Sequence, residues 1–346
     1  MNPVSGHATR YPGPARQRAR LVPLCVLAFA VSGLLGDNGV GVRQTRALAE
    51  TVASLDQTSA TAVFVRGIHA YVTLGSRLAI VDVADRARPR VIGHSPALPD
   101  LAQDVYVADD FAYVTAGDSG LWVVAISDPS SPSLVGAYDT PGFAGGVQVV
   151  GTRAYVADGW AGLQVIDVTN PAAPTALGSC PATRRARAIR VVGNYAYVAA
   201  EEEGLRVVDV SDPTAPVEVG SYAPTGDVND VTVVNNLAYL AAGGGGLQVL
   251  DVTHPTTPKQ LGGYTIPYGK SLHVANGHAY LATERSGLWI IDISGSQAPF
   301  AVSGFDTIQS ANDVYVDGGY AYIATGRSGL RVIDVSNPAG PVAADQ

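Results

Sequence analysis

The chain has 346 residues, of which 47% are hydrophobic and only 15% are charged, and it is rich in Gly (39) and Pro (22). Past residue 50 the sequence lacks stretches with a 3.6-residue period; short Val/Ile/Tyr runs between Gly, Pro, Asn and Asp indicate all-β structure with tight turns. The formal net charge of −8, with only two lysines (Lys259 and Lys270), excludes nucleic acid as an expected partner.

The N-terminus has the pattern of a secretory signal peptide. Four arginines precede an apolar stretch over residues 21–35, in which Ala28 and Ala30 suit cleavage. We predict a signal peptide over 1–30 and a linker over 31–46, and therefore a secreted or extracytoplasmic protein (periplasm or cell surface). An uncleaved anchor is the alternative, but the apolar stretch is shorter than the ~20 residues of a membrane span. Cleavage leaves a mature chain of formal charge −12 with no expected membrane span.

A ten-residue segment recurs seven times and dominates the remainder of the sequence. Its copies read RLAIVDVADR (77–86), GLWVVAISDP (120–129), GLQVIDVTNP (162–171), GLRVVDVSDP (204–213), GLQVLDVTHP (246–255), GLWIIDISGS (287–296) and GLRVIDVSNP (329–338). A tyrosine precedes each copy at a spacing of 41 or 42 residues, at Tyr71, Tyr113, Tyr155, Tyr197, Tyr239, Tyr280 and Tyr322. A fixed period of this length indicates a chain built from one repeated structural unit.

The fourth copy divides into four short strands. We predict these strands over residues 188–192, 195–200, 205–211 and 217–222. A two-residue Gly-Asn turn joins the first pair, and an Asp-Pro pair ends the third strand because proline cannot continue a strand ladder.

Four antiparallel strands in about 42 residues match one blade of a β-propeller. The second and third strands are apolar on nearly every residue, which indicates burial of both faces between neighbouring blades. We therefore predict an all-β fold, a seven-bladed β-propeller of four-stranded antiparallel blades over residues 47–346. A linear β-solenoid is the alternative, but it favours shorter coils without hairpin turns.

The two ends of the repeat region suggest how the ring closes. The last copy ends with residues 341–346, where a full fourth strand should lie, and residues 48–56 resemble the fourth-strand pattern of 218–224. We predict that this N-terminal strand completes the last blade, so that neither sheet edge stays open.

The motif GL-x-V-[IV]-D-V-[ST]-[DN]-P, with an upstream Tyr-Val strand, resembles the LVIVD-repeat family of exported bacterial and archaeal proteins over about residues 60–338. The resemblance implies a propeller in an extracytoplasmic location, and it implies no established catalytic residue. Two copies depart from the motif. Ala125 replaces the aspartate of the second copy, and Gly295-Ser296 replaces the Asp-Pro pair of the sixth.

An aspartate recurs near the end of the third strand in six copies. Residues repeated in every blade serve the blade, whereas a single binding site needs asymmetry. We therefore predict that each aspartate accepts hydrogen bonds from the following turn rather than ligating a metal. The six residues are Asp82, Asp167, Asp209, Asp251, Asp292 and Asp334.

Differences between copies concentrate on one face, where the loops entering the first strand and those joining the second and third strands lie together. Trp160, which lies in a loop between glycines, is a candidate contact because exposed aromatic side chains anchor interfaces. No catalytic residue is predicted. The candidate binding residues on or near this face are Phe143, Trp160, Arg187, Arg190, Tyr268 and His273.

Opposite charges face one another in the fourth copy, where Arg184, Arg185 and Arg187 lie on one loop and Glu201, Glu202 and Glu203 on the next. Either the two loops neutralise one another, or the arginines face the central channel and recruit an acidic group.

Three further carboxylates, Asp104, Asp230 and Asp313, share one position at the start of the first strand. Carboxylates around a channel mouth could hold a cation such as calcium. Their blades are not adjacent, however, and the expected separation disfavours shared ligation. No cofactor is therefore predicted, with calcium as the open alternative.

These patterns predict an exported, monomeric, non-catalytic binding or scaffolding module that engages a protein or a glycan through its variable face. The alternative is a propeller hydrolase or lyase acting on an extracellular polymer, which would need carboxylates converging at the channel. A purely structural surface protein is a third interpretation.

Overall fold

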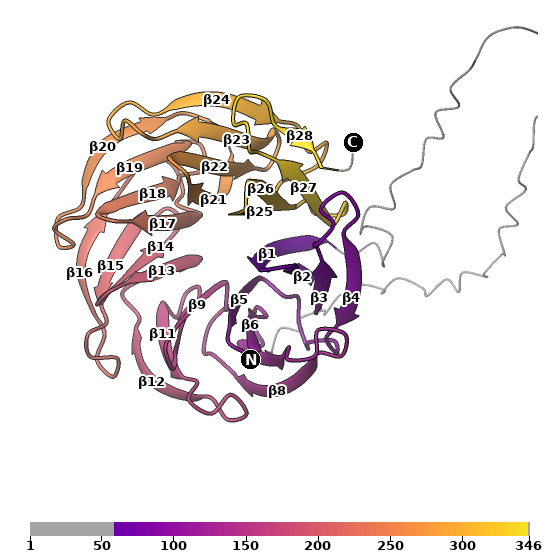
Figure 1. The fold of residues 1–346 in the computed structure, drawn as a ribbon. Coiled ribbons are helices and arrows are strands. Elements are labelled where there is room, and N and C mark those ends of the chain that lie inside the picture. Colours follow the sequence, from indigo (N-terminus) through magenta and orange to yellow (C-terminus); the bar gives the residue numbers. More distant parts are fainter. Residues whose placement is uncertain (1–58, 267, 345–346) are drawn as a thin grey trace, which may run out of the picture. The chain divides into compact units, whose positions relative to one another are not determined.

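The computed structural model describes residues 59–266 and 268–344, which form seven four-stranded antiparallel sheets arranged in a ring (Figure 1). The predicted signal peptide (1–30), the linker (31–46) and residues 48–56 lie outside the described residues. Within the described part of the chain, no helix is long and apolar enough to cross a membrane.

The four strands of each blade follow one another in sequence and lie side by side in that order. The first strands lie nearest the ring axis: β1 (Ala60–Arg66), β5 (Asp104–Ala108), β9 (Gly146–Val150), β13 (Ala188–Val192), β17 (Asp230–Val234), β21 (Gly269–Ala275) and β25 (Asp313–Asp317). The second strands are β2 (His69–Leu74), β6 (Phe111–Thr115), β10 (Arg153–Ala157), β14 (Tyr195–Ala199), β18 (Leu237–Ala241), β22 (His278–Thr283) and β26 (Tyr320–Ala324).

The two outer strands of each blade complete the sheets. The third strands are β3 (Arg77–Asp82), β7 (Leu121–Ala125), β11 (Leu163–Asp167), β15 (Leu205–Asp209), β19 (Leu247–Asp251), β23 (Gly287–Asp292) and β27 (Leu330–Asp334). The fourth strands are β4 (Arg90–His94), β8 (Ser133–Tyr138), β12 (Thr175–Cys180), β16 (Val217–Tyr222), β20 (Lys259–Tyr264), β24 (Phe300–Phe305) and β28 (Val342–Ala343).

The predicted seven-bladed propeller is confirmed, and the strands of the fourth repeat lie where its sequence placed them. Gly193 adopts a φ of 59° in the turn between β13 and β14, a left-handed conformation that glycine reaches without steric cost.

The hydrophobic core lies between the blades. Tyr197 of β14, for example, belongs to a buried cluster that also contains Val231 and Val233 of β17 and Ala238 of β18 in the next blade. Because every sheet packs against two neighbours, the second and third strands are apolar on both faces, as their sequences predicted.

The predicted closure by residues 48–56 stays a prediction, because these residues lie outside the described part of the chain. Among the described residues, the fourth strand of the last blade is β28, which pairs with β27 at Ile333 and Asp334. The first blade meets the last through hydrogen bonds. Ala60 donates its N–H to the Gly326 carbonyl (2.8 Å), and the Asn312 amide donates to the Ala60 carbonyl (2.8 Å).

The recurring aspartates cap the turns that follow the third strands, as predicted. In each of the six blades that carry this aspartate, its Oδ1 atom accepts a hydrogen bond from the backbone N–H two residues on, at 2.8–2.9 Å. These N–H groups belong to Ala84, Thr169, Ser211, Thr253, Ser294 and Ser336.

Candidate functional site

The loops joining the second and third strands meet the entries to the first strands of the next blades. Antiparallel bridges link them at five junctions: Gly117–Ala144, Gly159–Ala186, Glu201–Val228, Gly243–Gly269 and Gly326–Ala60. The two sets of loops therefore share one face, as the strand order predicted.

A cavity of about 710 Å³ opens among these loops and is walled by the first strands of all seven blades. Its wall consists of three layers, and each layer is made of residues at the same repeat position in the seven blades. The mouth layer contains Thr61, Gln103, Gly145, Arg187, Asn229, Lys270 and Asn312. The carboxylate layer contains Ala62, Asp104, Gly146, Ala188, Asp230, Ser271 and Asp313. The inner layer contains Phe64, Tyr106, Gln148, Arg190, Thr232, His273 and Tyr315, and all of these except Thr232 line the cavity.

The three aspartates of the carboxylate layer join neighbouring blades. In each aspartate, Oδ1 accepts a hydrogen bond from the backbone N–H of the residue that follows it. Its Oδ2 accepts a hydrogen bond from a backbone N–H in the first strand of the following blade. The inter-blade donors of Asp104, Asp230 and Asp313 are the N–H groups of Val147 (2.9 Å), Leu272 (2.9 Å) and Val63 (2.8 Å).

Ser271 connects two of these carboxyl groups. Its Oγ lies 2.6 Å from Asp313 Oδ1 and 3.0 Å from Asp230 Oδ2. A hydroxyl carries one proton, so it can donate to only one carboxylate at a time. If one of the two carboxyl groups is protonated, its O–H can donate to Ser271 Oγ while the Ser271 hydroxyl donates to the other, and both contacts are then hydrogen bonds.

The protonation of this layer is shifted by its surroundings. Burial, reinforced by Asp313, raises the pKa of Asp104 to about 7. Burial likewise raises the pKa of Asp230 to about 6 and raises the pKa of Asp313. Asp230 and Asp313 are closer than the separation of their blades suggested, since one Ser271 hydroxyl contacts both.

These shifts predict a stability that falls with rising pH. The folded-state pKa of Asp104 lies above its unfolded value of 3.8. The stability that this shift contributes to the folded protein is therefore complete below pH 3.8 and is lost as the pH rises through about 7. We expect the free energy of unfolding to be about 1 to 2 kcal/mol lower at pH 8 than at pH 6. Urea denaturation at the two pH values measures the difference.

His273 opposes this effect in part. Burial and Arg190 lower its folded-state pKa to about 4, whereas the unfolded histidine titrates near 6.5, so His273 adds stability as the pH rises from 6 to 8. The control is Asp104→Asn, which keeps His273 but lacks the carboxyl group, and it should lose the fall in stability between pH 6 and pH 8, whatever its absolute stability. An Asp104→Asn protein with the same slope as the parent would show that the carboxylate layer does not cause the effect.

The inner layer contains an aromatic cluster that the sequence analysis missed. The rings of Phe64, Tyr106, His273 and Tyr315, hereafter the aromatic wall, form a continuous series. Their centroids lie 5.1 Å apart for Phe64–Tyr106, 5.0 Å for Phe64–Tyr315 and 4.6 Å for His273–Tyr315. Aligning the seven copies by their tyrosine repeat, and comparing the position two residues after Asp104 and its equivalents, would have revealed these residues.

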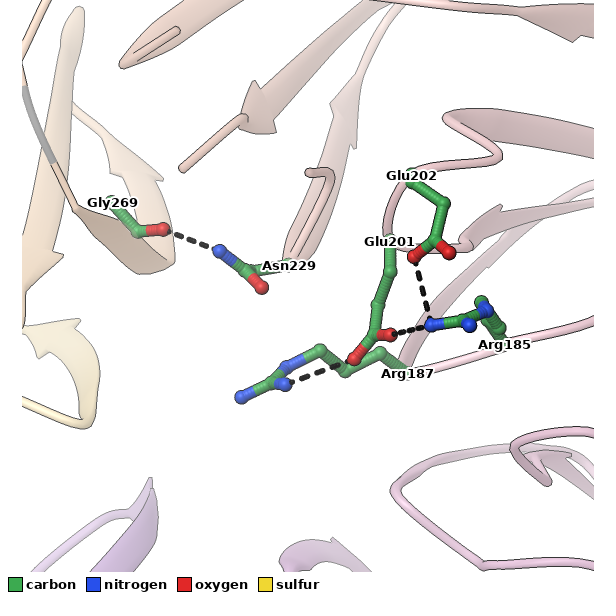
Figure 2. A network of polar contacts seen from close by, with 6 residues as sticks. All are labelled: Arg185, Arg187, Glu201, Glu202, Asn229 and Gly269. Atoms are coloured by element: carbon green, nitrogen blue, oxygen red, sulfur yellow. Dashed lines mark hydrogen bonds and ion pairs between the residues drawn. The ribbon is translucent and has the colours of Figure 1, made fainter. Parts of the chain in front are cut away.

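The mouth carries a charge network within the fourth blade (Figure 2). Arg185 Nη1 lies 2.9 Å from Glu202 Oε2 and 3.4 Å from Glu201 Oε2, while Arg187 Nη1 lies 3.4 Å from Glu201 Oε1. Glu201 thus lies between the two arginines, so the neutralising arrangement forms. Arg185 and Arg187 also line the cavity, as the second arrangement requires, and recruitment of an acidic group by them stays a prediction.

Trp160 and Phe143 lie at the rim of the cavity, where their side chains are 67% and 41% exposed. Asp158, a buried residue that the sequence analysis missed, holds their loops together. Its carboxylate accepts hydrogen bonds from Thr140 Oγ1 (2.6 Å) and the Gly142 N–H (2.9 Å). The two exposed rings are therefore presented by loops that are fixed to each other.

The structure brings five of the six candidate binding residues to the cavity. Tyr268 is the exception. It is absent from the cavity lining, and its ring instead stacks under the Arg285 guanidinium, with 4.3 Å between Cζ and the ring centroid. Among the described residues, no group of three or more His, Cys, Asp or Glu side chains is placed to hold a metal ion, and calcium stays an open alternative.

The fold and the site together define a seven-bladed β-propeller with an axial cavity lined by non-repeated side chains. The model of the LVIVD repeat matches the chain at residues 58–94, 101–140, 141–182, 183–224, 225–266, 268–307 and 309–345. The chain belongs to the LVIVD repeat family, as its motif indicated. No curated protein matches the sequence.

Solved structures resemble the chain in fold alone. The computationally designed Ika8 protein is similar with a TM-score of 0.62 and 11% identity, covering 83% of this chain and 86% of its own. A functionally unknown protein from Desulfotomaculum acetoxidans DSM 771 is similar with a TM-score of 0.63 and 14% identity, covering 75% of this chain and 90% of its own.

Proposed function

We propose that this protein is an exported, non-catalytic binding module that takes a protein or glycan partner at the mouth of its axial cavity. The observation that carries the proposal is the convergence of non-repeated side chains on this cavity. Equivalent positions of the seven blades hold Asp, Arg, Lys, His, Gln and aromatic residues there, whereas the outward parts of the blades repeat one motif. The proposed export rests on the signal-peptide pattern of residues 1–30.

The rim supplies the expected anchor for a partner. Trp160 is mostly exposed and lines the same rim as Phe143. The arginines of the fourth blade lie on the neighbouring loop, because Gly159 and Ala186 form a β-bridge. Aromatic and arginine side chains dominate binding energy at interfaces because they bury much area and still make directional contacts.

Replacing Trp160 with alanine should weaken partner binding by roughly 2 kcal/mol, about 30-fold in Kd, while the melting temperature changes little because the ring is exposed. The measurement uses glycan arrays and capture from the envelope and secreted fractions of the source organism, followed by titration of whatever binds. Tyr268→Ala is the matched control, since it removes an exposed aromatic ring that does not line the cavity. Equal losses for both variants, or an unfolded Trp160→Ala protein, would refute the assignment.

A hydrolase or lyase is the second candidate, and the carboxylate layer is the observation that favours it. Asp104 and Asp230 have pKa values of about 7 and 6, a range that suits general acid or base catalysis. Both oxygens of each carboxylate already accept backbone hydrogen bonds, however, which supports a structural role. Turnover in a screen of extracellular polymers, abolished by Asp104→Asn, would establish the enzyme instead.

A further inference from the structure

The inner layer of the cavity is divided into two chemically different halves. The aromatic wall comes from four consecutive blades around the ring junction, the sixth, seventh, first and second. The third, fourth and fifth blades contribute Gln148, Arg190 and Thr232. A ligand in the cavity therefore meets flat aromatic rings on one side and polar groups on the other.

Of the polar residues, Arg190 has unused hydrogen-bonding capacity. Gln148 is occupied, because its Oε1 accepts the Val191 N–H (2.7 Å) and its Nε2 donates to the Val191 carbonyl (3.4 Å). Arg190 makes one long contact, from Nη2 to Thr232 Oγ1 (3.5 Å), and its Nε is buried without a partner. No carboxylate among the described residues lies within ion-pair distance of its guanidinium.

The charges that face Arg190 leave it available to an anion. Arg190 lowers the pKa of Asp230, but the oxygens of Asp230 accept hydrogen bonds from two N–H groups and contact Ser271. His273 is neutral near pH 7 because burial and Arg190 lower its pKa. Towards the mouth, Lys270 Nζ donates to Asn312 Oδ1 (3.0 Å) and Ser310 Oγ (3.4 Å). Arg187 is paired with Glu201.

We infer that the cavity binds a carboxylate-bearing sugar, a uronate, whose carboxylate pairs with Arg190 and whose ring packs against the aromatic wall. The guanidinium fork matches a carboxylate with two parallel hydrogen bonds. The amide and hydroxyl groups of the mouth layer, such as Asn229, Gln103 and Thr61, can hydrogen-bond the sugar hydroxyls. A cavity of about 710 Å³ has the size of a small-ligand site and excludes a folded protein. The inference rests on the proposed binding function and specifies its ligand.

The test is calorimetric titration of the whole protein with three sugars that differ at one carbon. At C6, D-galacturonate carries a carboxylate, D-galactose carries an uncharged hydroxymethyl group and D-galactose 6-phosphate carries a phosphate ester. We expect galacturonate to bind at least about tenfold more tightly than galactose, the range of a hydrogen-bonded charge pair. D-glucuronate, titrated in parallel, tests tolerance of the hydroxyl configuration.

Variants of Arg190 distinguish charge from shape. Arg190→Gln should reduce galacturonate affinity to that of galactose, and Arg190→Lys should retain part of the preference because it keeps the charge without the fork. Arg90→Gln is the control, since Arg90 is an exposed arginine on β4 that does not line the cavity. Circular dichroism and melting confirm that each variant is folded.

A pH series provides a second signature. Protonation of Asp104 and Asp230 removes negative charge from the cavity as the pH falls from 8 to 5.5. A sugar carboxylate keeps its charge over this range. Galacturonate should therefore bind severalfold more tightly at pH 5.5 than at pH 8, while galactose shows little change.

The outcomes separate this inference from the proposed function. Equal affinity for galactose and galacturonate, an unaffected Arg190→Gln variant, or a preference for the phosphate would overturn the uronate assignment. If no sugar binds but a partner is still captured in a Trp160-dependent manner, the inference fails and the binding function stands. If neither occurs, both are wrong.

Discussion

Replacing Tyr197 with alanine is expected to lower the free energy of unfolding by about 3 to 5 kcal/mol, the cost of removing a buried aromatic ring. Tyr197 is only 4% exposed and packs against β17 and β18 of the next blade. Its loss would open a cavity at the interface between two blades. The rigid backbone of the sheets on either side limits how far the cavity can collapse. Chemical denaturation measures the change.

Trp160→Ala is the comparison, because it also truncates a large aromatic ring. That ring is 67% exposed, so the stability of the variant should stay close to that of the parent. A loss below about 1 kcal/mol for Tyr197→Ala, or equal losses for the two variants, would contradict the assignment of Tyr197 to the core.

Replacing Gly136 with valine should destabilise the propeller by about 3 kcal/mol or more, at the upper end of overpacking effects. Gly136 lies in β8, and a Cβ atom built on it would lie 2.1 Å from the Pro171 carbonyl oxygen in the third blade. Because that obstacle is backbone, the two blades must separate to admit the side chain. Thermal melting and denaturation measure the loss.

The matched control is Ala137→Val, on the exposed neighbour of Gly136 in the same strand. Valine suits an exposed strand position, so little change is expected. The sixth blade carries Ser303 at the position equivalent to Gly136, and its hydroxyl donates a hydrogen bond to the Pro338 carbonyl. Gly136→Ser should therefore be milder than Gly136→Val, and the reverse order would refute the steric explanation.

The repeat made the blades predictable. Seven copies of one motif fixed the number of blades, and the Gly-Asn turn and Asp-Pro break of the fourth copy placed its strands within one or two residues of those observed. The turn-capping aspartates were also predictable, because their hydrogen bonds are local in sequence. Closure is less local, because it joins segments far apart in the sequence. β28 pairs with β27 at two positions, and the role of residues 48–56 stays a prediction.

The candidate site was predicted in part. Phe143, Trp160 and His273 were recognised because they depart from the repeat, and each lines the cavity. Tyr268 departs from the repeat equally, but its loop turns the ring towards Arg285. The direction in which a loop side chain points depends on its neighbours and is not encoded by its position in a repeat.

The sequence by itself determined the family, the blade and the face on which differences gather, because periodic burial and turn chemistry act over a few residues. Only the tertiary structure decided which side chains meet. Ser271 lies between Asp230 and Asp313 although 41 or 42 residues separate it from each, and Phe64 packs between Tyr106 and Tyr315 from the two ends of the chain. Closing seven similar blades into a ring places equivalent residues side by side around one axis. The raised pKa values of the carboxylates and the unused donors of Arg190 arise from that closure.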